Sequence, residues 1–466
     1  MIGADGRRRE SPRPTPHPGT TGPRTISRSI ARTSPSSHSG NQGESTTETR
    51  AESNGPSGRP TASSLSLTEK RRTVRPPKAA TSKRPLRERR PPVKVNSLRT
   101  LSTFGQSVWL DFIRRGMFAS GELQRMIDRD GISGITSNPA IFEKAINGSD
   151  DYRDAIQELA AAGKNNLEIY EALVIEDVRT AADFFEPTYF RTEARDGYVS
   201  LEVSPRLAHD ADGTVDEARR LWGAVDRPNI MIKVPATVAG LSAIETLIAE
   251  GINVNVTLLF SLERYRQSAE AYLAGLRRRV KKGLPVERVA SVASFFLSRI
   301  DTAIDPVLEE LIAGGGEKAD SAGNVLGKTA VACAKVAYQI YGGVFGVNRF
   351  ADLAASDAET QRLLWASTST KNPAYSDVMY VEPLIGPETV NTLPMDTLDA
   401  YRDHGSPAAR LEQDLDEARR VLDALPELGI DLDEVTRRLE DEGIQKFIDP
   451  FDRLLDSLEK HRAAAL

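Results

Sequence analysis

A lysine set in an otherwise apolar stretch is the residue of this sequence whose surroundings could make it chemically reactive. Lys233 lies within the run 229–237, and its neighbours on both sides are apolar. Such a run is typical of a β-strand that is buried on both faces, as in parallel sheets. A buried lysine loses hydration, which lowers its pKa and frees its amine to act as a nucleophile. Considered alone, the run leaves an alternative open, in which Lys233 pairs with a carboxylate near the strand end or extends to water.

Two acidic side chains, Asp111 and Glu202, occur at or beside other predicted strands. An amine that condenses with a ketone needs one group to carry protons from the carbinolamine to the imine. A retro-aldol cleavage then needs a base to take the proton of the neighbouring hydroxyl. Asp111 and Glu202 can divide these tasks if their surroundings separate their pKa values. The imine is itself an electron sink, so we expect neither a cofactor nor a metal.

Several predicted strands also carry polar side chains on one face. In 252–258 the alternation places Asn253, Asn255 and Thr257 on one face, and the opposite face is aliphatic. Asn138 closes another predicted strand, directly before Pro139. The aliphatic face must meet packed helices, so the polar face turns inward. Unpaired buried polar groups each cost roughly 1–3 kcal/mol, which favours a cavity built around a polar ligand. A satisfied internal hydrogen-bond network is the alternative.

Cationic and hydroxyl side chains follow the late predicted strands. Arg299 lies three residues beyond the strand 289–296, and the stretch from Ser367 to Lys371 lies at the end of the strand 362–368. In barrels the loops after late strands commonly bind a substrate phosphate. Arginine offers a bidentate fork to a phosphate and lysine a point charge. For either cation the alternative is a surface salt bridge.

The elements that must position these residues alternate regularly from about residue 98 onward. Helical spacing of apolar residues in 239–249 ends at Gly251, and Ser261 can cap a following helix. Strands alternating with helices predict an α/β fold, a parallel sheet closed into a (β/α)8 barrel of the TIM type. Beyond about 387 we expect only additional C-terminal helices, at 408–426 and at 432–461, the latter broken by Pro450. The eight predicted strands are 108–113, 132–138, 197–204, 229–236, 252–259, 289–296, 362–368 and 377–385.

The net charge of -5 conceals two chemically different parts. Residues 1–95 carry about +13 and residues 96–466 about -18. The first part is rich in Ser, Pro and Arg and nearly free of aromatic residues, so we predict a disordered, basic extension. It could bind nucleic acid or anionic lipid, but it lacks aromatic residues for base stacking. The other interpretation is a nonfunctional extension, translated from a start upstream of the natural one.

The remaining composition excludes several classes of protein. The single cysteine, Cys333, excludes an intramolecular disulfide framework and fits a reducing compartment. No apolar run reaches membrane-spanning length, and the N-terminus lacks the apolar core of a secretory signal. The five histidines are scattered without the spacing of metal ligands. We therefore expect a cytoplasmic protein without a membrane partner.

Six stretches together resemble the class I, Schiff-base transaldolases, in the longer bacterial branch of that family. The resemblance covers about residues 100–400, in one order, and it implies the barrel fold. The stretches are 134–139 (Gly-Ile-Thr-Ser-Asn-Pro), 201–204 (Leu-Glu-Val-Ser), 232–237 (Ile-Lys-Val-Pro-Ala-Thr), 251–261 (Gly-Ile-Asn-Val-Asn-Val-Thr-Leu-Leu-Phe-Ser), 293–299 (Ala-Ser-Phe-Phe-Leu-Ser-Arg) and 365–373 (Trp-Ala-Ser-Thr-Ser-Thr-Lys-Asn-Pro).

The resemblance implies a transfer of a dihydroxyacetone unit between sugar phosphates without a metal. Lys233 would form a Schiff base with a ketose phosphate, either sedoheptulose 7-phosphate or fructose 6-phosphate. Asp111 would be the base in carbon–carbon cleavage, and Glu202 would move protons through a water near Thr257. The acceptor would be an aldose phosphate, either glyceraldehyde 3-phosphate or erythrose 4-phosphate, as in the pentose phosphate pathway.

The resemblance also implies which residues hold the substrate. Asn138 and Asn255 would hold the dihydroxyacetone moiety, and Ser294 its terminal hydroxyl. Many relatives have an arginine in the late loop where this chain has a lysine, so the lysine departs from the family pattern. The phosphate would be bound by Arg299, Ser367 and Lys371.

Two other functions are open to the same sequence. A fructose 6-phosphate aldolase on this fold resembles the chain, but that group lacks the glutamate found here at Glu202 and has a tyrosine in place of Phe296. The other is a catalytically idle barrel that the basic extension tethers to nucleic acid. We expect sugar phosphates as partners and no nucleic acid. We expect either a monomer or a homodimer.

Overall fold

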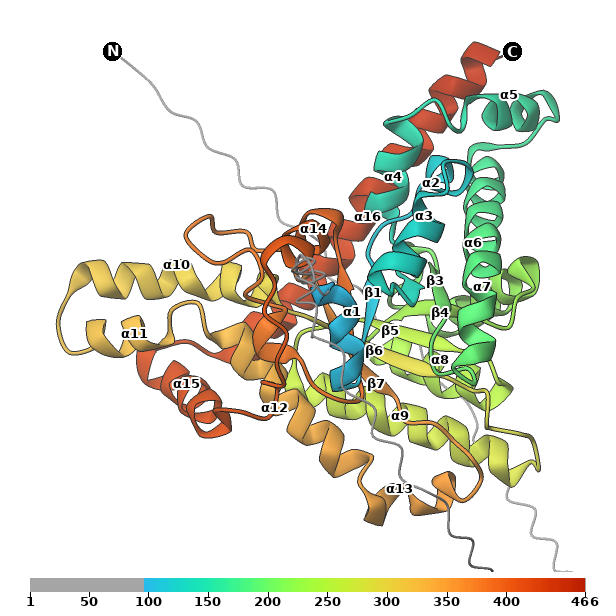
Figure 1. The fold of residues 1–466 in the computed structure, drawn as a ribbon. Helices are drawn as coiled ribbons and strands as arrows, with labels where there is room; N and C mark the ends of the chain where they lie inside the picture. The colour runs from blue at the N-terminus through green and yellow to red at the C-terminus, as the bar shows by residue number, and fades with distance from the viewer. Residues whose placement is uncertain (1–95, 466) are drawn as a thin grey trace, which may run out of the picture. The chain divides into compact units, whose positions relative to one another are not determined.

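A closed ring of eight parallel strands forms the centre of residues 96–465, the part of the chain that the computed structural model describes (Figure 1). Each strand pairs with the next in chain order, and β8 pairs back to β1. The predicted (β/α)8 barrel is therefore confirmed. The strands are β1 Gln106–Leu110, β2 Gly134–Ile135, β3 Tyr198–Glu202, β4 Ile230–Pro235, β5 Val254–Leu259, β6 Ser291–Phe296, β7 Arg362–Ala366 and β8 Thr389–Leu393.

Helices surround this ring, and two predicted helix boundaries are confirmed, the end of α8 at Gly251 and the start of α9 after Ser261. Thr237 caps the first turn of α8, which stops at Gly251 with a left-handed φ of 87°. Ser261 accepts a hydrogen bond from the backbone of Arg264 and so caps α9. The helices up to the seventh strand are α1 Ser97–Leu101, α2 Arg115–Ala119, α3 Glu122–Arg125, α4 Pro139–Asn147, α5 Arg153–Ala161, α6 Asn166–Arg191, α7 Ala211–Val225, α8 Val238–Glu250, α9 Leu262–Lys281, α10 Ser298–Gly314, α11 Ala319–Val325, α12 Thr329–Val344 and α13 Val347–Ala354.

The eighth strand lies further along the chain than predicted. Residues 377–385 are mostly apolar, but they form turns and the short 3-10 helix η4 Glu382–Leu384. Pro383 cannot donate to a strand ladder, which disfavours a strand there. The strand is Thr389–Leu393, and its two threonines and one asparagine interrupt the apolar pattern by which buried strands were predicted. The C-terminal helices therefore begin at Met395 and not at about 387.

The C-terminal helices are α14 Met395–His404, α15 Leu415–Leu428 and α16 Leu432–Ala465. The predicted break at Pro450 is wrong, because α16 continues through it. Proline removes one hydrogen bond from a helix, but the buried side chains of Phe447, Phe451 and Leu454 hold α16 on both sides of it. Helix α16 packs against α4, α5, α6 and α10 and also contacts β5 (Figure 1). It therefore reaches the barrel itself.

Strand β5 is irregular where it meets α16. Its pairing with β6 shifts register between Val256 and Leu259, and Leu258 has a left-handed φ of 60°. The Leu258 side chain lies beside Gly443 of α16. The alternation predicted for this strand therefore holds as far as Thr257 and fails at Leu258, as a β-bulge would cause.

The predicted extension at 1–95, with its proposed disorder and its basic clusters, lies outside the described residues. Within 96–465, no single helix is long and apolar enough to cross a membrane, although the bent pair α12 and α13 passes that test together by length and composition.

Candidate active site at the barrel mouth

Lys233 is buried inside the barrel near the carboxyl end of β4. Its side chain is 5% exposed, and its Nζ donates to the carbonyl oxygen of Ser137 at 3.0 Å. The same nitrogen lies 3.4 Å from Oε2 of Glu202 and 5.3 Å from the ring centre of Phe447 on α16. Lys233 does pair with a carboxylate, as the alternative interpretation expected, but this carboxylate belongs to Glu202, one of the two predicted acid–base groups. The amine is thus enclosed by polar atoms on one side and by an aromatic ring on the other.

Glu202 is the last residue of β3, directly opposite Lys233 in the strand register. Its side chain is 4% exposed, and its second oxygen, Oε1, is buried without a hydrogen-bond partner among the described residues. Burial raises the pKa of Glu202 to about 7, although Lys233 acts in the opposite direction. This carboxyl can therefore both release and accept a proton near neutral pH.

Asp111 follows the last residue of β1 and lines the same mouth. Its Oδ1 accepts a hydrogen bond of 2.7 Å from the hydroxyl of Thr136, which also bonds to Thr392 at 2.7 Å. Burial raises the pKa of Asp111, and Lys233 and Lys371 partly oppose that shift. The two threonines fix the orientation of the carboxylate, which the sequence alone did not indicate.

The predicted polar residues of β5 and β6 form a connected chain of hydrogen bonds. Ser294 donates to Oδ1 of Asn255 at 2.7 Å, and Nδ2 of Asn255 donates to Ser200 at 3.0 Å. Asn138 caps α4 by accepting from the backbone of Ile141. The hydroxyl of Thr257 is buried and has no partner among the described residues.

Cations gather at the rim of the mouth. Arg299 lies in the first turn of α10, and its Nη1 is buried without a partner among the described residues. Burial lowers the pKa of Lys371, and the charges of Arg299 and Lys144 lower it further. Lys144 on α4 and Lys446 on α16 complete the cation cluster, which we define as Arg299, Lys371, Lys144 and Lys446. Like charges at close range favour an anion between them.

Seven of the ten predicted residues line one cavity of about 550 Å³ at this mouth. Glu202, Asn255 and Thr257 do not line it. Glu202 and Asn255 connect to it through Lys233 and Ser294, whereas the Thr257 hydroxyl has no hydrogen-bond partner among the described residues. The volume suits a sugar phosphate. The predicted residues in the lining are Asp111, Asn138, Lys233, Ser294, Arg299, Ser367 and Lys371.

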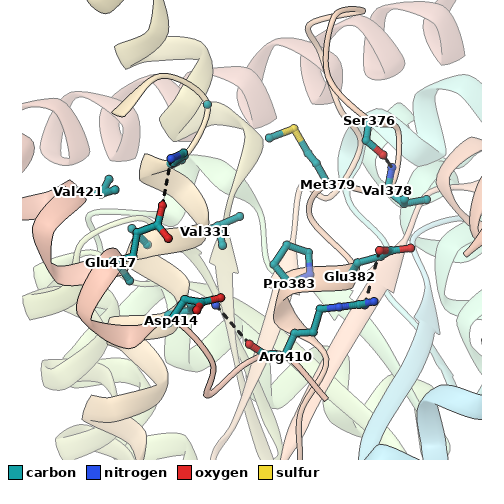
Figure 2. Close-up of a pocket in the computed structure, with 15 residues that line it drawn as sticks. Val331, Ser376, Val378, Met379, Glu382, Pro383, Arg410, Asp414, Glu417 and Val421 are labelled. Atoms are coloured by element: carbon teal, nitrogen blue, oxygen red, sulfur yellow. Dashed lines mark hydrogen bonds and ion pairs between the residues drawn. The ribbon is translucent and has the colours of Figure 1, made fainter. Parts of the chain in front are cut away.

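A second cavity of about 410 Å³ lies between α12, α15 and the segment that follows β7 (Figure 2). Figure 2 shows aliphatic side chains on its walls and charged ones that pair with one another. Lys328 bonds to Glu417 at 3.0 Å, and Arg410 lies 3.6 Å from Glu382. None of the ten predicted residues lines this cavity.

The sequence missed residues of two kinds. Thr136 and Ser137 lie inside the Gly-Ile-Thr-Ser-Asn-Pro stretch, so their strand position was a usable signal. Lys144 and Phe447 gave no signal, because only packing brings α4 and α16 to the mouth. Among the described residues, no group of three or more His, Cys, Asp or Glu side chains gathers as metal ligands would.

Comparisons with known proteins match most of this chain to one family. The family model described as "Transaldolase/Fructose-6-phosphate aldolase" matches residues 108–458. A "Transaldolase" of Trichodesmium erythraeum is 50% identical over 370 residues, which are 78% of this chain and 97% of the relative. A "Transaldolase" of Thiobacillus denitrificans is 50% identical over 361 residues, 78% of this chain and 99% of the relative. A "Transaldolase 2" of Streptomyces coelicolor is 47% identical over 366 residues, 78% of this chain and 97% of the relative.

Proposed function

Because the chain belongs to the transaldolase/fructose-6-phosphate aldolase family, we propose that the barrel mouth is its active site and that Lys233 is its nucleophile. The activity that the family and the named relatives show is that of a transaldolase, a transferase. It moves a dihydroxyacetone unit from sedoheptulose 7-phosphate or fructose 6-phosphate to glyceraldehyde 3-phosphate or erythrose 4-phosphate, in the pentose phosphate pathway. The observation that carries the proposal is the buried Lys233 amine, 3.4 Å from Glu202 in a cavity shared with Asp111.

Schiff-base formation is the first half of the reaction. The Lys233 nitrogen attacks the ketone carbon of the donor, and the oxygen takes a proton to give a carbinolamine. Glu202 then supplies a proton so that the hydroxyl leaves as water and the imine forms. Oε1 of Glu202 and the hydroxyl of Thr257, which lack hydrogen-bond partners among the described residues, support a bound water as the proton carrier, since buried polar atoms require partners.

Carbon–carbon cleavage is the second half. Asp111 takes the proton of the hydroxyl on the far carbon of the bond that breaks, and this carbon becomes the aldehyde carbon. The bond electrons move into the protonated imine, which becomes an enamine, and the aldose phosphate leaves. The acceptor aldehyde then reacts by the reverse steps. The raised pKa of Asp111 supports this role, because a carboxylate with a higher pKa is a stronger base.

Substrate binding uses the remaining residues. Asn138, Asn255 and Ser294 hold the three-carbon unit, and their existing hydrogen bonds fix the directions of their polar groups. Arg299, Ser367 and Lys371 bind the phosphate, and Lys144 adds a further charge. The positive φ of 54° at Ser367 supports a binding loop, because strained backbone concentrates at functional sites.

Borohydride reduction in the presence of fructose 6-phosphate tests the mechanism and the site together. We expect a three-carbon adduct on the peptide that contains Lys233. An adduct on another lysine, or none under turnover conditions, would refute the proposed nucleophile.

A fructose 6-phosphate aldolase is the second candidate, because the family description includes it. Glu202 and Phe296 favour transfer, as the resemblance implies. Consumption of fructose 6-phosphate should depend on added erythrose 4-phosphate. Equal consumption without an acceptor would instead indicate net cleavage.

The same proposal includes the partners, the location and the oligomeric state of the enzyme. Its partners are small-molecule sugar phosphates, and it acts in the cytoplasm as a monomer or a homodimer. It has no nucleic-acid or membrane partner, and it uses no cofactor or metal.

A further inference from the structure

The segment between β7 and β8, residues 367–388, is unusual for this barrel. It contains no α-helix, and within it only η4 is regular. Ser367 and Lys371 both lie in it. A segment without a helical or strand ladder must be ordered by other bonds, since fixing each residue costs about 1–2 kcal/mol of conformational entropy.

Helix α10 supplies such bonds through two aspartates one turn apart. Asp301 and Asp305 are spaced i, i+4, so they lie on the same face of the helix. Asp305 accepts a hydrogen bond of 2.9 Å from the hydroxyl of Tyr375, and Asp301 accepts one of 2.9 Å from Tyr380. Both tyrosines belong to the segment that carries Lys371.

The other oxygen of each aspartate is also occupied. Asp305 accepts from the backbone of Gly327 at 3.0 Å, and Asp301 accepts from the backbone of Ala330 at 2.8 Å. Gly327 has a φ of 69°, and a side chain there would meet the Tyr375 ring at 2.8 Å. The aspartates therefore join three parts of the chain: α10, the start of α12 and the segment 367–388.

These contacts lie directly beside the proposed phosphate site. A small cavity of about 190 Å³ is lined by both aspartates, both tyrosines and Lys371. Arg299, in the first turn of α10, precedes Asp301 by two residues. The helix that carries one phosphate-binding cation thus holds the segment that carries the other.

We propose that Asp301 and Asp305 are positioning residues for phosphate binding: through Tyr380 and Tyr375 they fix Lys371 at a set separation from Arg299. The inference rests on the proposed role of Lys371 in phosphate binding. Neither aspartate touches the reacting atoms, so the effect is on the affinity for the phosphate and not on the chemical step.

Tyr375→Phe is the sharpest test, because it removes one hydroxyl and keeps the ring on Gly327. We expect KM for fructose 6-phosphate to rise about tenfold, and the inhibition constant of inorganic phosphate to rise in parallel. We expect kcat to stay within about twofold. Tyr341→Phe is the matched control, since it removes a hydroxyl that bonds to Thr360 at 2.9 Å. Thr360 precedes β7 in the sequence and therefore lies at the end of that strand opposite to the mouth.

A double-mutant cycle separates this inference from the proposed function. If Tyr375 acts through Lys371, then Lys371→Met alone raises KM and Tyr375→Phe adds little to it. If Lys371→Met raises KM but Tyr375→Phe behaves like Tyr341→Phe, the positioning role is refuted and the phosphate role stands. If Lys371→Met leaves both KM and phosphate inhibition unchanged, the phosphate role fails and the positioning role fails with it.

Discussion

Two buried ion pairs lie at opposite ends of the same barrel, and they differ in how completely their atoms are bonded. At the amino-terminal end of the strands, Arg362 of β7 meets Asp196 at 3.1 Å, with side chains 6% and 12% exposed. At the carboxyl end, Lys233 meets Glu202 at 3.4 Å, with side chains 5% and 4% exposed. The two ion pairs are therefore nearly equal in burial, and each joins one cation to one carboxylate.

The amino-terminal pair belongs to a filled network. Arg362 also donates to Ser107 at 2.8 Å and to the carbonyl oxygen of Arg195 at 2.6 Å. Asp196 accepts further bonds from Ser107 at 2.6 Å and from Trp109 at 3.0 Å. Its carboxylate has a partner on each oxygen, as a buried charge requires if it is to be stable.

The carboxyl-terminal pair is left incomplete. One oxygen of Glu202 has no partner within the described part of the chain, and neither does Nη1 of Arg299 at the rim. The difference teaches that a buried charge alone does not mark a site. Buried polar atoms that lack a partner within residues 96–465 also occur at the amino-terminal end, at Gln106 and Gln361, so they indicate binding chemistry only beside a charged pair that borders a cavity, as Lys233 does.

The largest effect should come from breaking the carboxyl-terminal pair. Lys233→Met should lower turnover by about ten-thousandfold or more, a barrier increase of at least about 5.5 kcal/mol, because no other nucleophile replaces the amine. Steady-state kinetics and circular dichroism would show an inactive but folded barrel. Lys335→Met is the control, because the amine of that buried lysine donates to backbone oxygens of Arg410 and Gln413, outside the mouth. Residual activity within about tenfold of the parent would contradict the assignment.

Breaking the amino-terminal pair should affect stability and not chemistry. Arg362→Met leaves Asp196 buried without its cation, so the free energy of unfolding should fall by about 3–5 kcal/mol. Urea titration measures this loss, and kcat per folded molecule should be unchanged.

The half-exposed pair of Arg195 and Glu388 is the control for that experiment. Arg195→Met should change the unfolding free energy by less than about 1 kcal/mol. Equal losses in the two variants would show that the Arg362 network has no special role.

The third effect tests Glu202, whose Oε1 has no hydrogen-bond partner among the described residues. Glu202→Gln should slow formation of the borohydride-trapped imine by about a hundredfold. Burial raises the pKa of Glu202 to about 7, so its proton-donating form prevails below that pH and is lost above it. In the parent enzyme the trapping rate should therefore decrease as the pH rises through about 7. In the variant this decrease should be absent. A decrease that persists in Glu202→Gln would assign it to another group.

The smallest effect concerns the cation cluster at the rim. Lys144→Met should raise KM for fructose 6-phosphate about fivefold and leave KM for unphosphorylated fructose unchanged, because one charge contributes about 1 kcal/mol. Lys164→Met, which removes an exposed charge in the loop between α5 and α6 that pairs with Glu168, is the control. A similar KM change in both variants would show that net charge, and not this position, is responsible.

Much of the fold was predictable because barrel strands are local patterns. The apolar run around Lys233 and the alternation through Thr257 indicated buried strands with a polar inner face. The last strand was misplaced, because its pairing with β1 joins residues nearly three hundred positions apart and no local signal records it. Pro450 misled for a related reason, since packing against the barrel sustains α16 where propensity alone would end it.

By itself, the sequence determined which side chains of the strands face inward, because side-chain direction alternates with every residue of a strand. That rule placed Glu202 and Asn255 on inner faces, whereas the resemblance to the transaldolases, and not the alternation, assigned Ser294 to the site. Only the tertiary structure decided which of their atoms remain unbonded and which distant helices enclose them. Phe447 over the amine and Lys144 at the rim arise from packing between segments far apart in the chain, and such contacts leave no periodic trace in the sequence.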